Sequence, residues 1–152
     1  MTEIYEAQNY LDSVSMMNNG GCGIAAIAMK RWMRKNKNKN VNIIFGFSQY
    51  SENLYQNNCR AIAGLEDGLP SACTHAGFKL KGEIYDSNGK WSKTQFKFLL
   101  PMPEKIAVAA VNDFTNWNIA FSRSTHVPRI AKTMDIDLSD IWLVNPAWRE
   151  VY

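Results

Sequence analysis

A loop of asparagine and glycine that leads directly into an apolar helical pattern is the feature that most constrains the fold of this chain. Residues 18–21 are two asparagines followed by two glycines, and these residue types favour turns and left-handed backbone over regular elements. Apolar side chains then recur at the spacing of one helical face, at Ile24, Ile27, Ala28 and Trp32. The sequence therefore predicts a helix over residues 22–35 that packs this face on a core.

Cys22 lies at the first turn of this predicted helix, between Gly21 and Gly23. Unpaired N–H groups and the positive end of the helix dipole favour a thiolate at such a position. The flanking glycines let the backbone of a substrate approach the sulfur closely. A lone cysteine is commonly a small buried hydrophobic residue, but this setting favours a nucleophile.

Length and composition indicate a single globular domain over residues 1–152. Apolar residues make up 46% of the chain and aromatic residues 12%, which is ordinary for a protein with a packed core. The three cysteines are an odd number without regular spacing, which favours reduced thiols. We expect no cofactor and no zinc site, because Cys73 and His75 do not have the spacing of an ordinary ligand pair.

The sequence shows no pattern typical of a membrane span or a signal peptide. No run approaches the ~20 apolar residues that cross a bilayer, and residues 1–10 lack the apolar core of a signal peptide. We therefore expect no membrane partner and a protein that is cytoplasmic where it is made. Delivery by other machinery, without a signal peptide, stays open.

The net charge of +3 is unevenly distributed, because six lysines and arginines fall within residues 30–39. Such a cluster could contact a nucleic acid. Cations also favour the C-terminal end of a helix, and alternating Lys and Asn is typical of a solvated loop. No stacking aromatic residues alternate with the lysines, so we favour the solvated interpretation over nucleic-acid binding.

The order of patterns along the chain predicts an α+β fold. We expect helices over residues 4–11, 43–55 and 71–76, the last capped by Gly77, and then a strand over residues 78–85. Short apolar runs predict four later strands, over residues 106–111, 117–121, 126–131 and 141–144. In this arrangement the Cys22 helix packs on a C-terminal antiparallel sheet.

A thiol nucleophile needs a base and a group that orients the base. Of the two histidines, His75 falls within a predicted helix and His126 at the start of a predicted strand, so His126 is the preferred base. Asn145 follows the last predicted strand, where its side-chain oxygen could accept the imidazole N–H. Carboxylates at Asp135, Asp137 and Asp140 are alternatives that fit better as a solvated turn.

These residues resemble the papain-like cysteine peptidase superfamily, and within it the double-glycine bacteriocin-processing peptidases. Cys22-Gly23 opens an alanine-rich helix, residues 76–78 form an Ala-Gly-Phe turn, and Thr125-His126-Val127 leads an apolar segment. An apolar run then ends in Asn-Pro-Ala at residues 145–147. The resemblance covers residues 21–147. It depends on the order and spacing of these short motifs and not on any one of them.

The resemblance implies a papain-like fold and a catalytic set of Cys22, His126 and Asn145. Three features differ from the pattern: Asn145 replaces the usual aspartate, and Met16 stands where a glutamine lines the oxyanion hole. Pro128 and Arg129 also interrupt the apolar strand that follows the histidine. Asn18 or Asn19 could supply the missing donor with the Cys22 N–H. One oxyanion donor is worth roughly 100- to 1000-fold in rate.

The expected function is a thiol hydrolase or acyltransferase that acts on an amide bond, as a peptidase, a cell-wall amidase or a deamidase. Its partners would be a peptide, a protein or a peptidoglycan peptide, and an inhibitor or immunity protein. Size and composition resemble those of a bacterial or phage protein, including secreted effectors. The alternative is a catalytically inactive papain-like module that binds a partner peptide or protein, which the changes at Asn145 and Met16 would favour.

Overall fold

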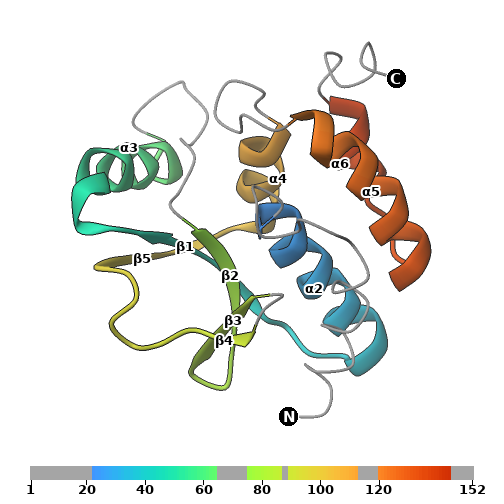
Figure 1. Ribbon diagram of the computed structural model, residues 1–152, viewed down its shortest axis with the longest axis horizontal. Helices are drawn as coiled ribbons and strands as arrows, with labels where there is room; N and C mark the ends of the chain where they lie inside the picture. Colours follow the sequence, from blue (N-terminus) through green and yellow to red (C-terminus); the bar gives the residue numbers. More distant parts are fainter. Residues whose placement is uncertain (1–21, 65–74, 87–88, 113–119, 145–152) are drawn as a thin grey trace.

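The computed structural model describes residues 22–64, 75–86, 89–112 and 120–144, without the side chains of residues 112, 120–126 and 142–144. The first described element is helix α2 (Cys22–Lys37), followed by strand β1 (Asn42–Phe47), a short 3-10 turn and helix α3 (Glu52–Ile62). Four strands come next: β2 (His75–Leu80), β3 (Glu83–Asp86), β4 (Gly89–Lys90) and β5 (Phe98–Met102). Helices α4 (Glu104–Asn112), α5 (Ala120–Met134) and α6 (Ser139–Val144) complete the order (Figure 1).

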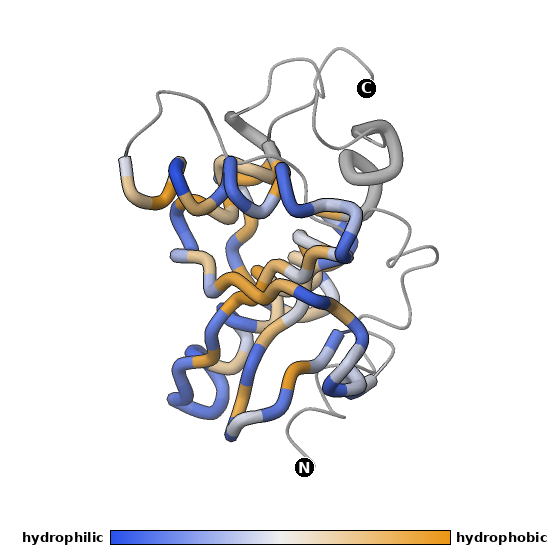
Figure 2. The backbone as a smooth tube through the Cα atoms, turned by 90° about the vertical axis from the view of Figure 1, so that its left-hand side faces the viewer, coloured by the Kyte–Doolittle hydropathy of each residue, from blue (hydrophilic) through white to orange (hydrophobic). Residues whose placement is uncertain are grey.

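The strands form one antiparallel sheet in the order β4-β3-β2-β1-β5. Its centre is β1, which pairs with β2 on one side and β5 on the other and is buried at every position after Asn42. Hydrophobic stretches gather where the strands cross in the middle of the fold, and hydrophilic ones lie towards the edges (Figure 2). The fold class is therefore α+β, as the sequence predicts.

Helix α2 lies between the sheet and helices α4 and α5 (Figure 1). It contacts β2 on one side and α4 and α5 on the other, and every residue from Cys22 to Met29 is buried. A helical segment that is apolar all round is enclosed on all sides, which holds for this first half of α2 and not for residues 34–37, which are polar and exposed. The predicted N-terminal helix is thus confirmed, and so is its packing on an antiparallel sheet.

Strands β2 and β3 form a tight hairpin. Leu80 pairs with Glu83, and the two residues between them, Lys81 and Gly82, have φ angles of 53° and 81°. Two consecutive positive φ angles define the turn whose twist matches that of the flanking strands. The single strand predicted over residues 78–85 is therefore two strands, and the turn between them went unrecognised.

The last third of the chain was predicted wrongly as strands. Residues 106–111 lie in α4, residues 126–131 in α5 and residues 141–144 in α6. A short apolar run does not by itself distinguish a buried strand from a buried helix. The helical signals were present: Pro103-Glu104 precedes three alanines in α4, and the buried residues of α5 are Val127, Ile130 and Met134, at helical spacing.

The sheet is consequently built from residues 42–102 and is not C-terminal. Residues 42–47 form β1 where a helix was expected, and helix α3 begins only at Glu52. His75 and Ala76 open β2, and Gly77 is a strand residue and not a helix cap. The predicted helices over residues 4–11 and 71–74, and the predicted strand over residues 117–119, lie outside the described residues; Ala120 and Phe121 are helical.

None of the helices in the described part of the chain is both long and apolar enough to cross a bilayer.

Candidate active site

Cys22 is the first residue of α2, the helix enclosed between the sheet and the helical layer. The last turn carries Arg34, Lys35 and Lys37, and these cations complement the negative C-terminal end of a helix dipole whose positive end lies at the cysteine. Only 5% of Cys22 is exposed.

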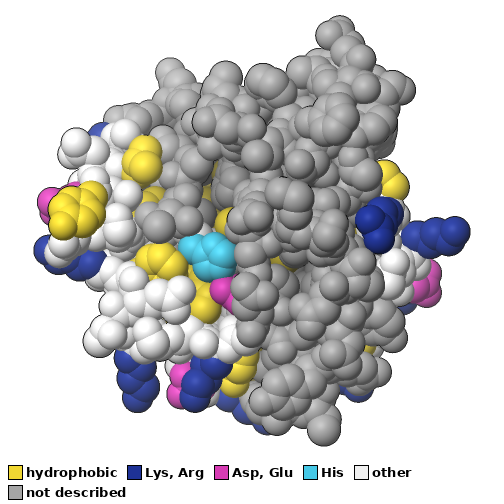
Figure 3. Space-filling view, in the orientation of Figure 1, with side chains coloured by type: hydrophobic (Ala, Val, Ile, Leu, Met, Phe, Trp, Pro, Cys, Tyr) yellow, Lys and Arg dark blue, Asp and Glu magenta, His cyan; other side chains and the backbone are white. Residues whose placement is uncertain are grey.

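His75 and Asp86 lie at the open end of the β2–β3 hairpin, away from its turn. His75 is the first residue of β2 and Asp86 is the last residue of β3. The pairing of Phe78 with Tyr85 brings these ends together. The Nε2 atom of His75 donates a hydrogen bond to Oδ2 of Asp86, at 2.7 Å. Figure 3 shows the imidazole on one face of the molecule, next to an acidic group and between hydrophobic side chains.

Asp86 is held by a second donor. The indole Nε1 of Trp91 donates to the same Oδ2 atom at 2.8 Å, and the Asp86 side chain is only 10% exposed. The backbone N–H of Trp91 bonds to the carbonyl of Ile84, which fixes the indole beside the hairpin. A buried carboxylate with two directed hydrogen bonds is well suited to orienting an imidazole.

Two glycines make room for the aromatic side chains around His75. A Cβ atom on Gly77 would lie 2.6 Å from the carbonyl oxygen of Tyr85 and 2.8 Å from the Trp91 indole. A Cβ atom on Gly46 would lie 2.8 Å from the Phe96 ring. These glycines are therefore needed for the close approach of the two aromatic side chains to the sheet.

The imidazole of His75 also interacts with Cys22. Burial lowers the pKa of His75, but the hydrogen bonds to Asp86 and to Cys22, and the charges of both groups, raise it overall to about 9. Because Nε2 is engaged by Asp86, Nδ1 is the ring nitrogen left for the sulfur. The structure thus brings together a cysteine, an imidazole and a carboxylate from α2, β2 and β3.

This arrangement uses a different histidine from the one that the sequence favoured. His126 does not begin a strand but lies within α5, and its side chain is not among those described. Asn145, Asn18, Asn19 and Met16 lie outside the described residues. His75 was passed over because residues 71–76 were predicted as a helix, although Lys81-Gly82 between two strand-like runs was a usable hairpin signal.

The described residues include no group of three histidine, cysteine or acidic side chains that could hold a metal ion. Cys73, which was considered with His75 for such a role, lies outside the described residues.

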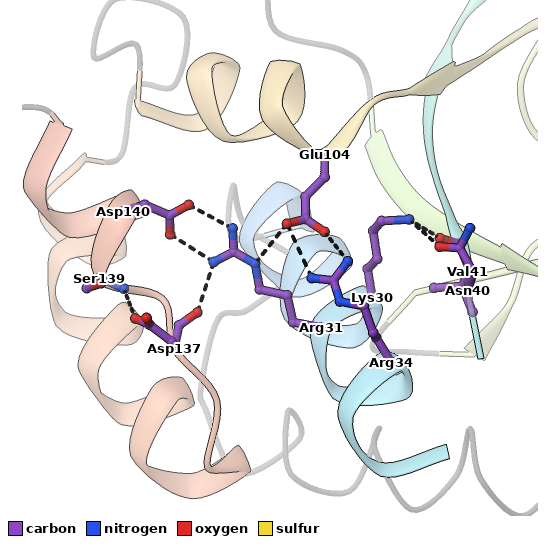
Figure 4. A network of polar contacts seen from close by, with 9 residues as sticks. All are labelled: Lys30, Arg31, Arg34, Asn40, Val41, Glu104, Asp137, Ser139 and Asp140. Atoms are coloured by element: carbon purple, nitrogen blue, oxygen red, sulfur yellow. Dashed lines mark hydrogen bonds and ion pairs between the residues drawn. The ribbon is translucent and has the colours of Figure 1, made fainter. Parts of the chain in front are cut away.

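The basic segment at the end of α2 is paired within the fold (Figure 4). Arg31 binds both carboxylate oxygens of Asp140, at 2.8 and 2.7 Å, and its Nε lies 3.3 Å from Glu104. Arg34 also binds Glu104, and Lys30 donates to the side chain of Asn40 and the carbonyl of Val41. The arginine contacts join α2 to α4 and α6, and the Lys30 contacts join α2 to the segment before β1. The charge cluster therefore has a structural role.

Comparison of the chain with protein-family models, with curated proteins and with solved structures found no match.

Proposed function

We propose that this protein is a papain-like thiol hydrolase or acyltransferase that acts on an amide bond. The observation that supports this most strongly is a single imidazole, that of His75, engaged by Asp86 through Nε2 and interacting with Cys22. A nucleophile, a base and a group that orients the base are the parts that covalent acyl transfer needs.

In the proposed reaction, the Cys22 thiolate attacks the carbonyl carbon, and a C–S bond forms as the carbonyl oxygen becomes an oxyanion. The His75 imidazolium then gives its proton to the amine nitrogen as the C–N bond breaks, which leaves a thioester on Cys22. His75 next takes a proton from water, or from an acceptor amine, as that group attacks the thioester. The acyl group leaves as an acid or a new amide, and Cys22 is restored.

The surrounding residues support each step. A histidine with a pKa of about 9 carries a proton at neutral pH, so His75 has a proton to give to the leaving amine. Asp86 keeps the ring in one orientation through both proton transfers. The Cys22 backbone N–H belongs to the first turn of α2, where N–H groups lack helical acceptors and are available to an oxyanion.

The direct test is acylation by a small activated ester. Incubation with p-nitrophenyl acetate should produce an acetyl adduct on Cys22, identified by peptide mass spectrometry, together with a burst of nitrophenolate. Cys59, a partly exposed thiol of the same chain, is the internal control and should remain unmodified. Equal modification of both cysteines would refute the proposal.

The inactive binding module remains the alternative function, and one observation favours it: Cys22 is almost fully buried. That alternative predicts that iodoacetamide modifies Cys22 no faster than Cys59 at pH 6.5. The enzyme hypothesis predicts modification of Cys22 at least several-fold faster at the same pH.

A further inference from the structure

A small cavity opens beside the candidate active site. It has a volume of about 210 Å³, and its walls include Trp91, Phe96, Leu99, Lys79, Lys93 and Glu83. We call these six residues and the space between them the lysine pocket. Its volume suits one amino-acid side chain and is too small for a larger ligand, since pockets for drug-sized ligands have volumes of about 300 Å³ or more.

Two residues belong to both the lysine pocket and the surroundings of His75. The ring centroid of His75 lies 5.5 Å from that of Trp91 and 6.2 Å from that of Phe96. Lys79 lies four residues along β2 from His75, a rise of ~13 Å. A peptide bound with its scissile amide at Cys22 would therefore place a residue within about four positions of that bond in the pocket.

The lining of the pocket selects for a group that is partly apolar and negatively charged. Trp91, Phe96 and the half-exposed Leu99, at 46%, offer apolar surface. Lys79 and Lys93 outnumber the single acid Glu83, and among the described residues neither lysine has an ion-pair partner. A carboxylate on a short aliphatic stem matches both properties.

We propose that the lysine pocket is a subsite for a carboxylate of the substrate, so that the enzyme prefers amide bonds with a carboxylate nearby. The carboxylate would come from a glutamyl side chain or from the C-terminus of a peptide. This inference rests on the proposed function, because the pocket acts on the substrate that Cys22 attacks.

The test compares rates of Cys22 alkylation by peptide electrophiles, measured on the full chain by intact mass and peptide mapping. Alanine tripeptides ending in a chloromethyl ketone extend to the acyl side of the electrophile, and chloroacetyl tripeptides extend to the other side. In each set, one position at a time carries Glu in one peptide and Gln in its matched partner. The chloroacetyl peptides are also made in two forms, one with a free C-terminus and one with an amidated C-terminus. These pairs separate a side-chain carboxylate from a terminal one.

We expect one carboxylate position to react about five- to tenfold faster than its neutral counterpart, with less preference in 0.5 M salt. The double variant Lys79→Glu/Lys93→Glu should abolish or reverse this preference. The control Lys97→Glu/Lys105→Glu makes the same charge change at lysines that do not line the pocket and should retain it. Iodoacetamide, small and neutral, should modify Cys22 equally in all three proteins, which shows that the site is intact.

Equal rates for charged and neutral probes at every position would overturn the subsite, and so would a preference that survives in Lys79→Glu/Lys93→Glu. In either case rapid reaction of Cys22 with iodoacetamide would leave the proposed function standing. If iodoacetamide modifies Cys22 no faster than Cys59, the proposed function fails, and the subsite fails with it.

Discussion

Nε2 of His75 and Oδ2 of Asp86 lie 2.7 Å apart, although the two residues are separated by the whole length of a hairpin. The tight turn at Lys81-Gly82 sets the register that brings them together. The same oxygen accepts the indole N–H of Trp91. The orientation of the imidazole towards Cys22 therefore depends on a local element, the β2–β3 hairpin, and on one aromatic side chain beside it.

The two histidines can be distinguished by substitution. We expect His75→Gln to reduce the rate of iodoacetamide modification of Cys22 at pH 6.5 by about tenfold or more, because the proposed nucleophile loses the imidazole beside it. His126→Gln should leave the rate unchanged. Modification is measured by peptide mass spectrometry with Cys59 as the internal reference, and a loss of reactivity in His126→Gln alone would contradict the assignment of His75.

The pKa of His75 can be measured directly by NMR, because the chain has only two histidines and the His126→Gln variant leaves one imidazole signal. We expect that signal to titrate near pH 9. In Asp86→Asn the pKa of His75 should fall by about one unit or more, because the charge that favours the imidazolium is lost. An unchanged pKa in Asp86→Asn would show that Asp86 does not act on the imidazole.

The same raised pKa makes stability depend on pH. A group whose pKa is higher in the folded state stabilises that state fully below its unfolded value, near 6.5, and this contribution is lost as pH rises through about 9. The free energy of unfolding of the native chain relative to His75→Gln should therefore decrease between pH 6.5 and 9.5, by about 1–2 kcal/mol after allowance for solvent screening. Urea unfolding at several pH values measures this difference, and a difference that grows with pH would contradict it.

Substitution by alanine should destabilise the fold more at Gly77 than at Gly46. Gly77→Ala places Cβ 2.6 Å from the backbone oxygen of Tyr85 and also against Trp91, so we expect a loss of about 2–3 kcal/mol in the free energy of unfolding. Gly46→Ala meets only side chains, chiefly Phe96, and should cost less. Urea unfolding of both variants checks this order, which would be wrong if Gly46→Ala proved the more damaging.

Arg31 and Arg34 both bind Glu104 but differ in exposure. The Arg31 side chain is 14% exposed and also holds both oxygens of Asp140, whereas Arg34 is 54% exposed. We expect Arg31→Met to lower the free energy of unfolding by about 1–3 kcal/mol, since it leaves Asp140 without its bidentate partner. Arg34→Met should cost less than about 1 kcal/mol. Equal effects in thermal or urea unfolding would show that the contact of Arg31 with Asp140 adds nothing.

The position of Cys22 at the start of a helix was predictable from sequence, because it depends on local signals. Two glycines and two asparagines interrupt the chain and an apolar helical face follows, so the start of α2 at Cys22 is specified within about ten residues. The α+β class followed from similar patterns. The placement of the sheet did not, because apolar runs such as residues 106–111 suit a buried helix as well as a buried strand.

The partners of Cys22 were decided by tertiary structure. No pattern within residues 71–76 shows that His75 opens a strand, and the pairing of that strand with β1 and β3 is what brings the imidazole to the helix start. Sequence by itself determined that Cys22 lies at the start of a long helix. Which histidine meets that sulfur, and which carboxylate orients it, depended on strand register, because contacts between distant segments are specified by packing and not by local preference.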